Sequence, residues 1–195
     1  PRELQNASTM KFVKKQYNSF TLENEMKPDA ILGSSAKLIS VADAKKKGYY
    51  IPAGYAESTV PELAFTTVDK SLEAAKNNGL KMRAHTLVWH SQTPSWFFTK
   101  NYDGSKVVTP AVMDARLDFY IHNVMGHVMD KEKALTGSAG SIVYAWDVVN
   151  EYLHRPSFAF FKTWTSVYGD MGNSPSYVKK AFEIAYDMLK SYQAT

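Results

Sequence analysis

The sequence predicts an α/β protein with a parallel β-sheet, forming part of a larger (β/α)8 TIM barrel. Strand-like and helix-like segments alternate along the chain, which is typical of βα units. The segment 142–149 (IVYAWDVV) is apolar almost throughout, as in strands that are covered on both faces. The 195 residues contain only three predicted strands, which are too few to close a barrel. A complete barrel of this kind typically needs eight strands and about 250 residues.

The N-terminal half contains three predicted helices, one of them short, and two predicted strands. Residues 3–16 place apolar side chains near helical spacing, and residues 18–23 (NSFTLE) form a short strand. Glycine and proline interrupt residues 27–62, so we expect a long loop there, with a short helix near 40–47. A helix over 66–77 should end before Gly79, because glycine accepts the left-handed conformation. Residues 80–89 (LKMRAHTLVW) follow as the second strand.

The C-terminal half begins with a strong helix start at Thr109-Pro110, a hydroxyl residue followed by proline at the first helical position. The core side of this helix is predicted to carry Met113, Leu117, Tyr120 or Ile121, Val124 and Val128. A turn over 136–140 leads to the strand 142–149. The last helix is predicted to start at Ser174-Pro175 and to turn inward Val178, Ala181, Phe182, Ala185 and Leu189.

Composition excludes several classes of protein. The 23 basic and 19 acidic residues are dispersed, and Lys45–Lys47 is predicted to be a solvated helix end, so we expect no nucleic-acid partner. No apolar run approaches the ~18–20 residues that span a bilayer, so no membrane association is expected. The absence of cysteine excludes disulfides and thiolate metal sites. The first residues are polar and contain no signal peptide.

Polar and aromatic side chains gather where the predicted strands end, at residues 23–27, 89–94 and 150–151. Active sites of α/β barrels lie at these carboxyl ends. Hydrogen-bonding groups beside indole rings suit the binding of a sugar. Glu151 lies just after the carboxyl end of the apolar strand, which also carries Trp146. Partial burial there would raise the pKa of the carboxyl group and favour the protonated form that a general acid requires. The alternative is an ordinary surface glutamate.

Each of the other candidates also has an ordinary structural explanation. His85 and Trp89 are four residues apart and should share one face of a strand, whereas His90 points to the other. His85 could equally be a hydrogen-bonded histidine of the core instead of a sugar-binding residue. No metal site is expected, because no helical HExxH-type spacing occurs. Asn24 and Lys27, with Glu23, combine an amide, a donor and an acceptor, which could also form an exposed salt bridge.

Three motifs in this order resemble glycoside hydrolase family 10, the endo-1,4-β-xylanases. They are residues 18–27 (NSFTLENEMK), 85–92 (HTLVWHSQ) and 146–151 (WDVVNE), and the similarity continues into the helix at 177–182. The resemblance implies that residues 1–195 are a partial glycoside hydrolase catalytic domain, covering roughly the second to fourth βα units. We therefore expect an incomplete N-terminal portion of the (β/α)8 barrel that lacks the first strand and the last four βα units.

The resemblance also implies a role for individual residues in a retaining hydrolysis of xylan. Glu151 would be the acid/base, and Asn150 would bind the 2-hydroxyl of the sugar at the cleavage site. The sugar-binding residues would be Lys27, His85 and Trp89 at that sugar, and Glu23, Asn24 and Gln92 at the next, while His90 and Trp96 would mostly pack. The nucleophile would lie outside this chain, so the isolated chain should be inactive. No cofactor and no metal are implied.

The chain departs from the family pattern at two positions, with Pro28 where tryptophan is usual and Ala84 where glycine is common.

The expected partners are xylan or xylo-oligosaccharides and the remaining part of the barrel, from the same or a second polypeptide. Secretion is expected because a polymer is met outside the cell. Three alternatives remain: a cellulase or mannanase of the same barrel plan, a non-catalytic carbohydrate-binding fragment, and an α/β domain with coincidental motifs.

Overall fold

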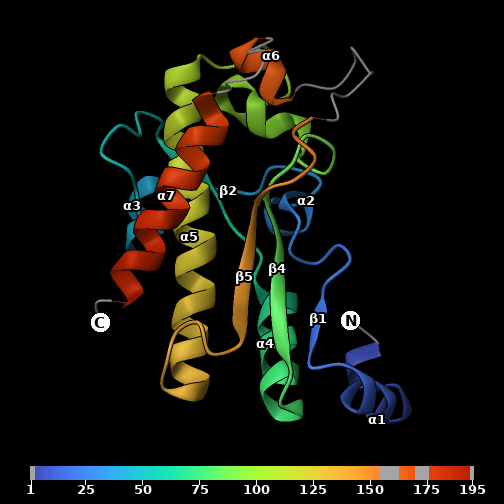
Figure 1. Ribbon diagram of the computed structural model, residues 1–195. Coiled ribbons are helices and arrows are strands. Elements are labelled where there is room, and N and C mark those ends of the chain that lie inside the picture. Colours follow the sequence, from blue (N-terminus) through green and yellow to red (C-terminus); the bar gives the residue numbers. More distant parts are fainter. Residues whose placement is uncertain (1–2, 154–162, 170–175, 194–195) are drawn as a thin grey trace.

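A three-stranded parallel sheet forms the centre of the computed structural model, which describes residues 3–153, 163–169 and 176–193. Its strands are β1 (Ser19–Thr21), β4 (Lys81–Val88) and β5 (Val143–Val149), side by side in the order β1-β4-β5 (Figure 1). Both pairings are parallel, with Phe20 opposite Met82 and Val88 opposite Val149. The predicted parallel sheet is confirmed, and its strand order follows the chain as in a barrel.

Three long helices follow the strands and pack against one another. They are α4 (Thr66–Asn78), α5 (Pro110–Thr136) and α7 (Ser176–Gln193), with α5 lying between the other two (Figure 1). The shorter helices are η1 (Glu3–Gln5), α1 (Ala7–Gln16), α2 (Pro28–Leu32), α3 (Val41–Lys46), η2 (Ser95–Phe98), η3 (Lys100–Tyr102) and α6 (Trp164–Tyr168). None of the helices in the described ranges combines the length and apolar character needed to cross a membrane.

Local side-chain chemistry explains where the helices begin and end. α1 begins at Ala7, later than predicted, because the Asn6 side chain accepts hydrogen bonds from the backbone N–H groups of Ser8 and Thr9 at 3.0 and 3.1 Å. α4 ends at the predicted place, with Gly79 in the left-handed conformation. α5 begins at Pro110 as predicted, but the Thr109 hydroxyl makes no capping hydrogen bond in the described structure. Proline at the first position therefore marks this start.

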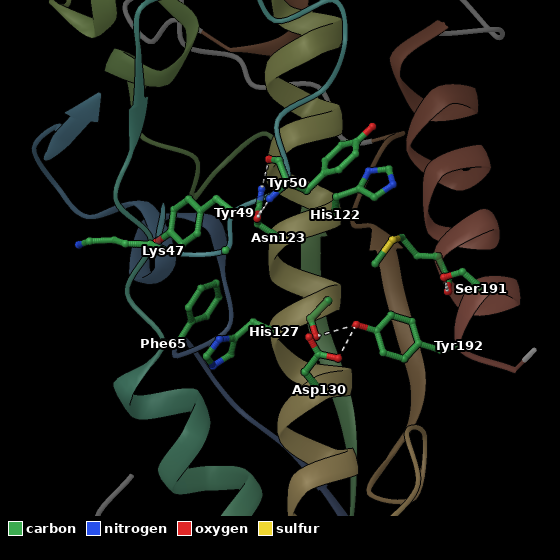
Figure 2. Close-up of a pocket in the computed structure, with 13 residues that line it drawn as sticks. Lys47, Tyr49, Tyr50, Phe65, His122, Asn123, His127, Asp130, Ser191 and Tyr192 are labelled. Atoms are coloured by element: carbon green, nitrogen blue, oxygen red, sulfur yellow. Dashed lines mark hydrogen bonds between the residues drawn. The ribbon is translucent and has the colours of Figure 1, made fainter. Parts of the chain in front are cut away.

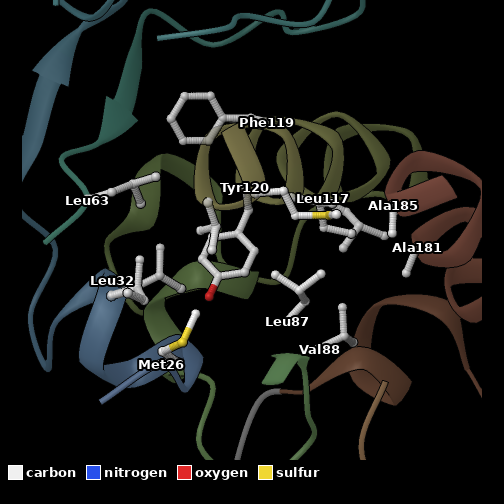
Figure 3. Close-up of a cluster of buried hydrophobic side chains, with 14 of the residues drawn as sticks. Met26, Leu32, Leu63, Leu87, Val88, Leu117, Phe119, Tyr120, Ala181 and Ala185 are labelled. Atoms are coloured by element: carbon white, nitrogen blue, oxygen red, sulfur yellow. The ribbon is translucent and has the colours of Figure 1, made fainter. Parts of the chain in front are cut away.

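The core lies between the sheet and the helices. Leu117 and Tyr120 of α5 face Leu87 and Val88 of β4, and Met26 closes the same cluster from below (Figure 3). Every residue predicted for the inner side of α5 is buried. Burying one such side chain contributes roughly 1.5–3 kcal/mol, so this face of α5 sets the position of β4 and its carboxyl end.

Two predictions of burial were wrong. β5 was expected to be covered on both faces, but Tyr144 is 57% exposed, and within the described residues β5 pairs only with β4. On α7, Ala181 and Ala185 are buried as predicted, whereas Phe182 is 52% exposed and Leu189 is also exposed. The buried stripe of α7 runs through Tyr177, Ala181, Ile184, Ala185 and Met188. It is rotated by about one residue from the predicted stripe, so that the small Ala181 and Ala185 lie at the packed side.

The segment 27–62, predicted as a loop with one short helix, is more ordered than expected. The helix is confirmed as α3, but β2 (Leu38–Ser40) and β3 (Thr59–Pro61) also pair as an antiparallel hairpin. Strands of three residues are too short to show an alternating pattern in the sequence, which explains why the hairpin was missed. α2 was likewise missed because it holds only five residues after Lys27.

Two side chains of α5 bind this segment to the barrel helices. Arg116 is completely buried and forms a two-pronged ion pair with Glu57, its Nε and Nη2 lying 2.7 and 2.5 Å from the two carboxylate oxygens. Its Nη1 also donates to the carbonyl of Phe97 at 2.6 Å. Asn123 accepts from the backbone N–H of Tyr50 and donates to its carbonyl, both at 2.9 Å. Specific polar contacts with α5 therefore fix the position of this segment.

A buried carboxylate joins the end of α5 to the start of β5. Glu132 is fully buried, and its side chain accepts hydrogen bonds from the backbone N–H groups of Gly140, Ile142 and Val143 at 2.9, 2.7 and 2.6 Å. Three N–H donors on one carboxylate compensate for its removal from water. Glu132 therefore holds the turn that feeds the chain into β5.

We predict that Glu132→Gln lowers the free energy of unfolding by about 1.5–3 kcal/mol, because a neutral amide cannot accept all three hydrogen bonds. Urea unfolding of the purified protein measures the change. Glu73→Gln is the matched control, since Glu73 forms only a partly exposed ion pair with Lys131 and should change stability by less than about 1 kcal/mol. Equal losses in the two variants would contradict the assignment.

Candidate active site

The three segments predicted to carry the site meet at the carboxyl ends of the strands. The backbone N–H of Asn150 donates to the carbonyl of Val88 at 2.9 Å, so the chain after β5 stays beside the chain after β4. The backbone N–H of Asp29 donates to the carbonyl of Gln92 at 2.9 Å, which joins the segment after β1 to the same place. The structure thus brings together residues separated by more than a hundred positions in the sequence.

A buried ammonium group lies at the centre of the first cluster. Lys27 is 8% exposed, and its Nζ donates to the side-chain oxygens of Asn24 and Gln92 at 3.0 and 2.8 Å. The same Nζ lies 4.8 Å from the centre of the Trp89 ring, within range of a cation–π interaction. Lys27, Asn24, Gln92 and Trp89 were all predicted as sugar-binding residues, and the structure places them in contact.

A second cluster is centred on Asp147 of β5. Its carboxylate lies 2.8 Å from Nδ1 of His85 and accepts from Nε of Arg83, also at 2.8 Å. The Thr86 hydroxyl donates to the Asp147 carbonyl at 2.7 Å. The hydrogen bond and the charge of Asp147 raise the pKa of Arg83. Because Nδ1 of His85 faces the carboxylate, its Nε2 is the ring nitrogen directed elsewhere.

The Glu151 carboxylate is linked to the first cluster through Trp89. The indole Nε1 of Trp89 donates to Oε2 of Glu151 at 2.9 Å. Glu151 has a φ of 49°, in the left-handed region that non-glycine residues seldom adopt. We expected partial burial of Glu151, but it is exposed. In this structure a specific donor, and not burial, is what holds the carboxylate.

The backbone of Trp89 is fixed by two hydrogen bonds to its carbonyl group. Its carbonyl accepts from the Thr93 hydroxyl at 2.5 Å and from the indole of Trp164 at 3.2 Å. Trp164 is buried and stacks on Tyr177 with ring centres 5.1 Å apart, and burial raises the pKa of Tyr177 to about 12. Because α6 and α7 supply these rings, the position of Trp89 depends on elements far along the chain.

The remaining predicted residues lie at the same edge with fewer contacts. Glu23 is exposed beside Asn24, and Asn150 is half-buried beside Glu151. Trp96 is buried and donates to the carbonyl of Gly33 at 3.1 Å, which agrees with the packing role expected of it. The predicted site residues therefore lie at the carboxyl ends of the strands, except His85, which lies within β4 opposite Asp147.

Sequence reasoning missed two carboxylates that organise these clusters. Asp147 lies inside the apolar strand run, and an acid within such a run was the signal that could have revealed it. Asp29 accepts from Nε2 of Gln92 at 3.1 Å, and only its position two residues after Lys27 connected it with the site. Neither contact could be predicted without the pairing of the segments, because Asp147 and His85 are 62 positions apart.

A hollow of about 510 Å³ lies on the helical side of the molecule, between residues 47–50, α5 and α7 (Figure 2). Its rings are stacked in pairs, Tyr50 on His122 and Phe65 on His127, with centres 4.0 and 3.8 Å apart. His127 also contacts Asp69 at 2.7 Å. These groups bind one another across the elements that meet there, so the hollow marks a structural junction away from the strand ends.

The arrangement at the strand ends has the composition of a saccharide-binding edge. Amide, ammonium, imidazole and carboxyl groups surround an indole ring, and such groups bind hydroxyls while the ring packs against a sugar face. The fold and this edge together define a barrel protein of the glycan-binding or glycan-cleaving class. Within the described residues, no group of three or more His, Asp or Glu side chains could hold a metal ion.

Comparison with known proteins agrees with this class. The family model described as glycosyl hydrolase family 10 matches residues 1–193. An endo-1,4-beta-xylanase A of Butyrivibrio fibrisolvens is 48% identical over 98% of this chain, and an endo-1,4-beta-xylanase A of Thermotoga neapolitana is 36% identical over 92%. These alignments cover 45% and 14% of the two relatives, so the chain spans less than half of each.

Solved structures give the same result. The endo-1,4-beta-D-xylanase 10B of Clostridium thermocellum, in complex with xylohexaose, matches with a TM-score of 0.69 and 29% identity over 95% of this chain and 33% of its own. An intracellular xylanase of Thermoanaerobacterium saccharolyticum, in complex with xylotriose, matches with a TM-score of 0.67 and 27% identity over 98% and 49%. The chain belongs to glycosyl hydrolase family 10, and its fold is part of a (β/α)8 barrel.

We predict that Lys27→Met changes the free energy of unfolding by less than about 1 kcal/mol, because the cost of burying the ammonium offsets most of its hydrogen bonding. The apolar stem of methionine keeps the packing of the lysine stem. Thermal unfolding measures the change, with the exposed Lys37→Met as control. A loss above about 2 kcal/mol would show that Lys27 is kept for stability and not for a ligand.

Proposed function

We propose that this chain supplies the acid/base side of the active site of a retaining endo-1,4-β-xylanase. The observation that carries the proposal is the Glu151 carboxylate, held by Trp89 at 2.9 Å beside the Lys27 cluster. Family membership supports a glycoside hydrolase, and the relatives described as xylanases support xylan as the substrate. The nucleophilic carboxylate would lie in the part of the enzyme that this chain does not cover.

In this proposal Glu151 moves protons at the glycosidic oxygen. Trp89 engages Oε2 of Glu151, so we assign Oε1 to the leaving oxygen of the substrate. Glu151 donates its proton to that oxygen as the second carboxylate attacks the anomeric carbon and the glycosidic bond breaks. Glu151 then takes a proton from the water that releases the sugar. Such a pair of carboxyls lies about 5–5.5 Å apart in retaining enzymes.

The neighbouring side chains would hold the sugar at the cleavage site. With Nδ1 of His85 bound to Asp147, Nε2 of His85 can bind a hydroxyl. The Lys27 ammonium donates to a second hydroxyl, and the Trp89 ring packs on an apolar face of the sugar. Asn150 would bind the 2-hydroxyl, an interaction that strengthens as the transition state gains oxocarbenium character.

The next sugar along the chain would contact three further residues. The side chains of Asn24 and Gln92 accept from Lys27 at 3.0 and 2.8 Å, and Nε2 of Gln92 also donates to Asp29 at 3.1 Å, so both amides are oriented before a ligand binds. Glu23 is exposed at the same edge and can accept from a hydroxyl. Groups fixed before binding lose little conformational entropy when the substrate arrives.

We also propose that the complete protein is exported and that the rest of the barrel comes from the same or a second polypeptide. A polymeric substrate is met outside the cell, which supports export. Mass spectrometry of the purified enzyme identifies the polypeptides that it contains, and fractionation of the producing cells locates it. Recovery of the active enzyme from the cytoplasm alone would contradict export.

We predict that Glu151→Gln in the complete protein lowers turnover of xylan by about 10²–10⁴-fold, because the amide cannot donate the required proton. Binding of xylo-oligosaccharides, measured by calorimetry, should persist. Release of reducing ends measures turnover. Glu183→Gln, at an exposed position on α7, is the control and should leave turnover unchanged.

The same assay separates the alternatives. A carbohydrate-binding fragment would keep its affinity in Glu151→Gln and have no turnover to lose. A cellulase or mannanase would prefer cellulose or mannan to xylan when the three are compared at equal mass. Full xylan hydrolysis by Glu151→Gln would refute the role of Glu151.

We predict that Asp147→Asn lowers kcat/KM on xylo-oligosaccharides by about 10–100-fold. The change removes the charged acceptor of the hydrogen bond to Nδ1 of His85, a contact that is worth about 1.5–3 kcal/mol, and so weakens the orientation of the His85 ring. Nitrogen NMR of the His85 ring would show a changed tautomer population. The control is Asp69→Asn, because Asp69 contacts His127 away from the strand ends. Unchanged kinetics in Asp147→Asn would contradict the role of the pair.

A further inference from the structure

Asp29 connects α2 to the segment that follows β4. Its backbone N–H donates to the Gln92 carbonyl at 2.9 Å, and its carboxylate accepts from Nε2 of Gln92 at 3.1 Å. Two contacts with one residue fix both the backbone and the side chain of Gln92. The proposed mechanism assigns no role to Asp29.

The chemistry of these partners determines which way the Gln92 amide points. An ionised carboxylate can only accept hydrogen bonds, and an ammonium can only donate them. The Gln92 amide lies between Asp29 and Lys27, so its NH2 group must face the carboxylate and its oxygen must face the ammonium. The observed contacts, 3.1 Å from Nε2 to Asp29 and 2.8 Å from Oε1 to Lys27, follow this arrangement.

The position of the Lys27 ammonium depends on this amide. Lys27 is 8% exposed, and its two hydrogen-bonding partners in the described structure are the neutral oxygens of Asn24 and Gln92. The Trp89 ring provides the third contact at 4.8 Å. Loss of one amide oxygen would leave a buried charge with half its hydrogen bonds, which is costly. An anchored Gln92 is therefore required to keep the ammonium over the ring.

We propose that Asp29 is a positioning residue, which acts through Gln92 to hold the second sugar site and the Lys27 ammonium in register with Glu151. The inference rests on the proposed xylanase function. Asp29 need not touch the substrate, since its carboxylate is engaged by Gln92. Its effect should be largest on substrates that occupy the site contacted by Gln92.

Kinetics of the complete enzyme on two aryl glycosides test this proposal. An aryl β-xyloside fills only the sugar site at the cleavage point, whereas an aryl β-xylobioside also fills the site of Gln92. Asp29→Leu, which keeps the branched shape but removes the acceptor, should lower kcat/KM on the xylobioside by roughly 10-fold, with a smaller loss on the xyloside. Asp29→Asn should retain most activity, because its amide oxygen still accepts.

A double-mutant cycle separates positioning from a purely structural role. In the Gln92→Ala background, Asp29→Leu should cause no further loss on the xylobioside, because its effect passes through Gln92. If Asp29→Leu does not fold, as thermal unfolding would show, Asp29→Ala takes its place in the same cycle. Equal losses on both substrates, or additive losses in the double variant, overturn the inference while leaving the proposed function intact. A wild-type enzyme that cleaves neither glycoside nor xylan overturns both.

Discussion

The position of β4 is the constraint on which the rest of this structure depends. It is the strand that pairs on both sides, with β1 and β5, and its residues alternate between two environments. Met82 and Ala84 are buried, while Arg83 and His85 face the opposite side and meet Asp147. Parallel pairing places the carboxyl ends of all three strands at one edge. The chain that leaves β4 then delivers Trp89 and the residues after it to that edge.

Polar groups at this edge are only partly compensated by contacts within the protein. A buried ammonium is held by two neutral oxygens and a ring, and Glu151 adopts a positive φ with an exposed carboxylate. Strained or incompletely compensated groups are usual at functional sites, where the surrounding fold offsets their cost. Here the free-energy cost of these groups is offset by the apolar face of α5, the buried Arg116 and the rings of Trp164 and Tyr177 next to Trp89.

Much of the fold and of the site could be predicted from residues that are close in the sequence. Thr109-Pro110 and Gly79 marked helix ends, and the apolar residues of α5 identified its buried face. The failures came where neighbours decide the outcome. Phe182 has the hydrophobicity of a core residue, yet the approach of α7 to α5 leaves it outside. The short hairpin of β2 and β3 has no pattern of its own and exists because its strands pair with each other.

The sequence by itself determined the class of chemistry, because side-chain types at the ends of predictable strands are a local property. It placed Lys27, Trp89 and Glu151 at one edge, and the structure agrees. Only the tertiary structure decided which groups touch. The bonds of Asp147 to His85 and of Asp29 to Gln92 join segments more than sixty positions apart. Such contacts follow from strand pairing and helix packing, which no local pattern records.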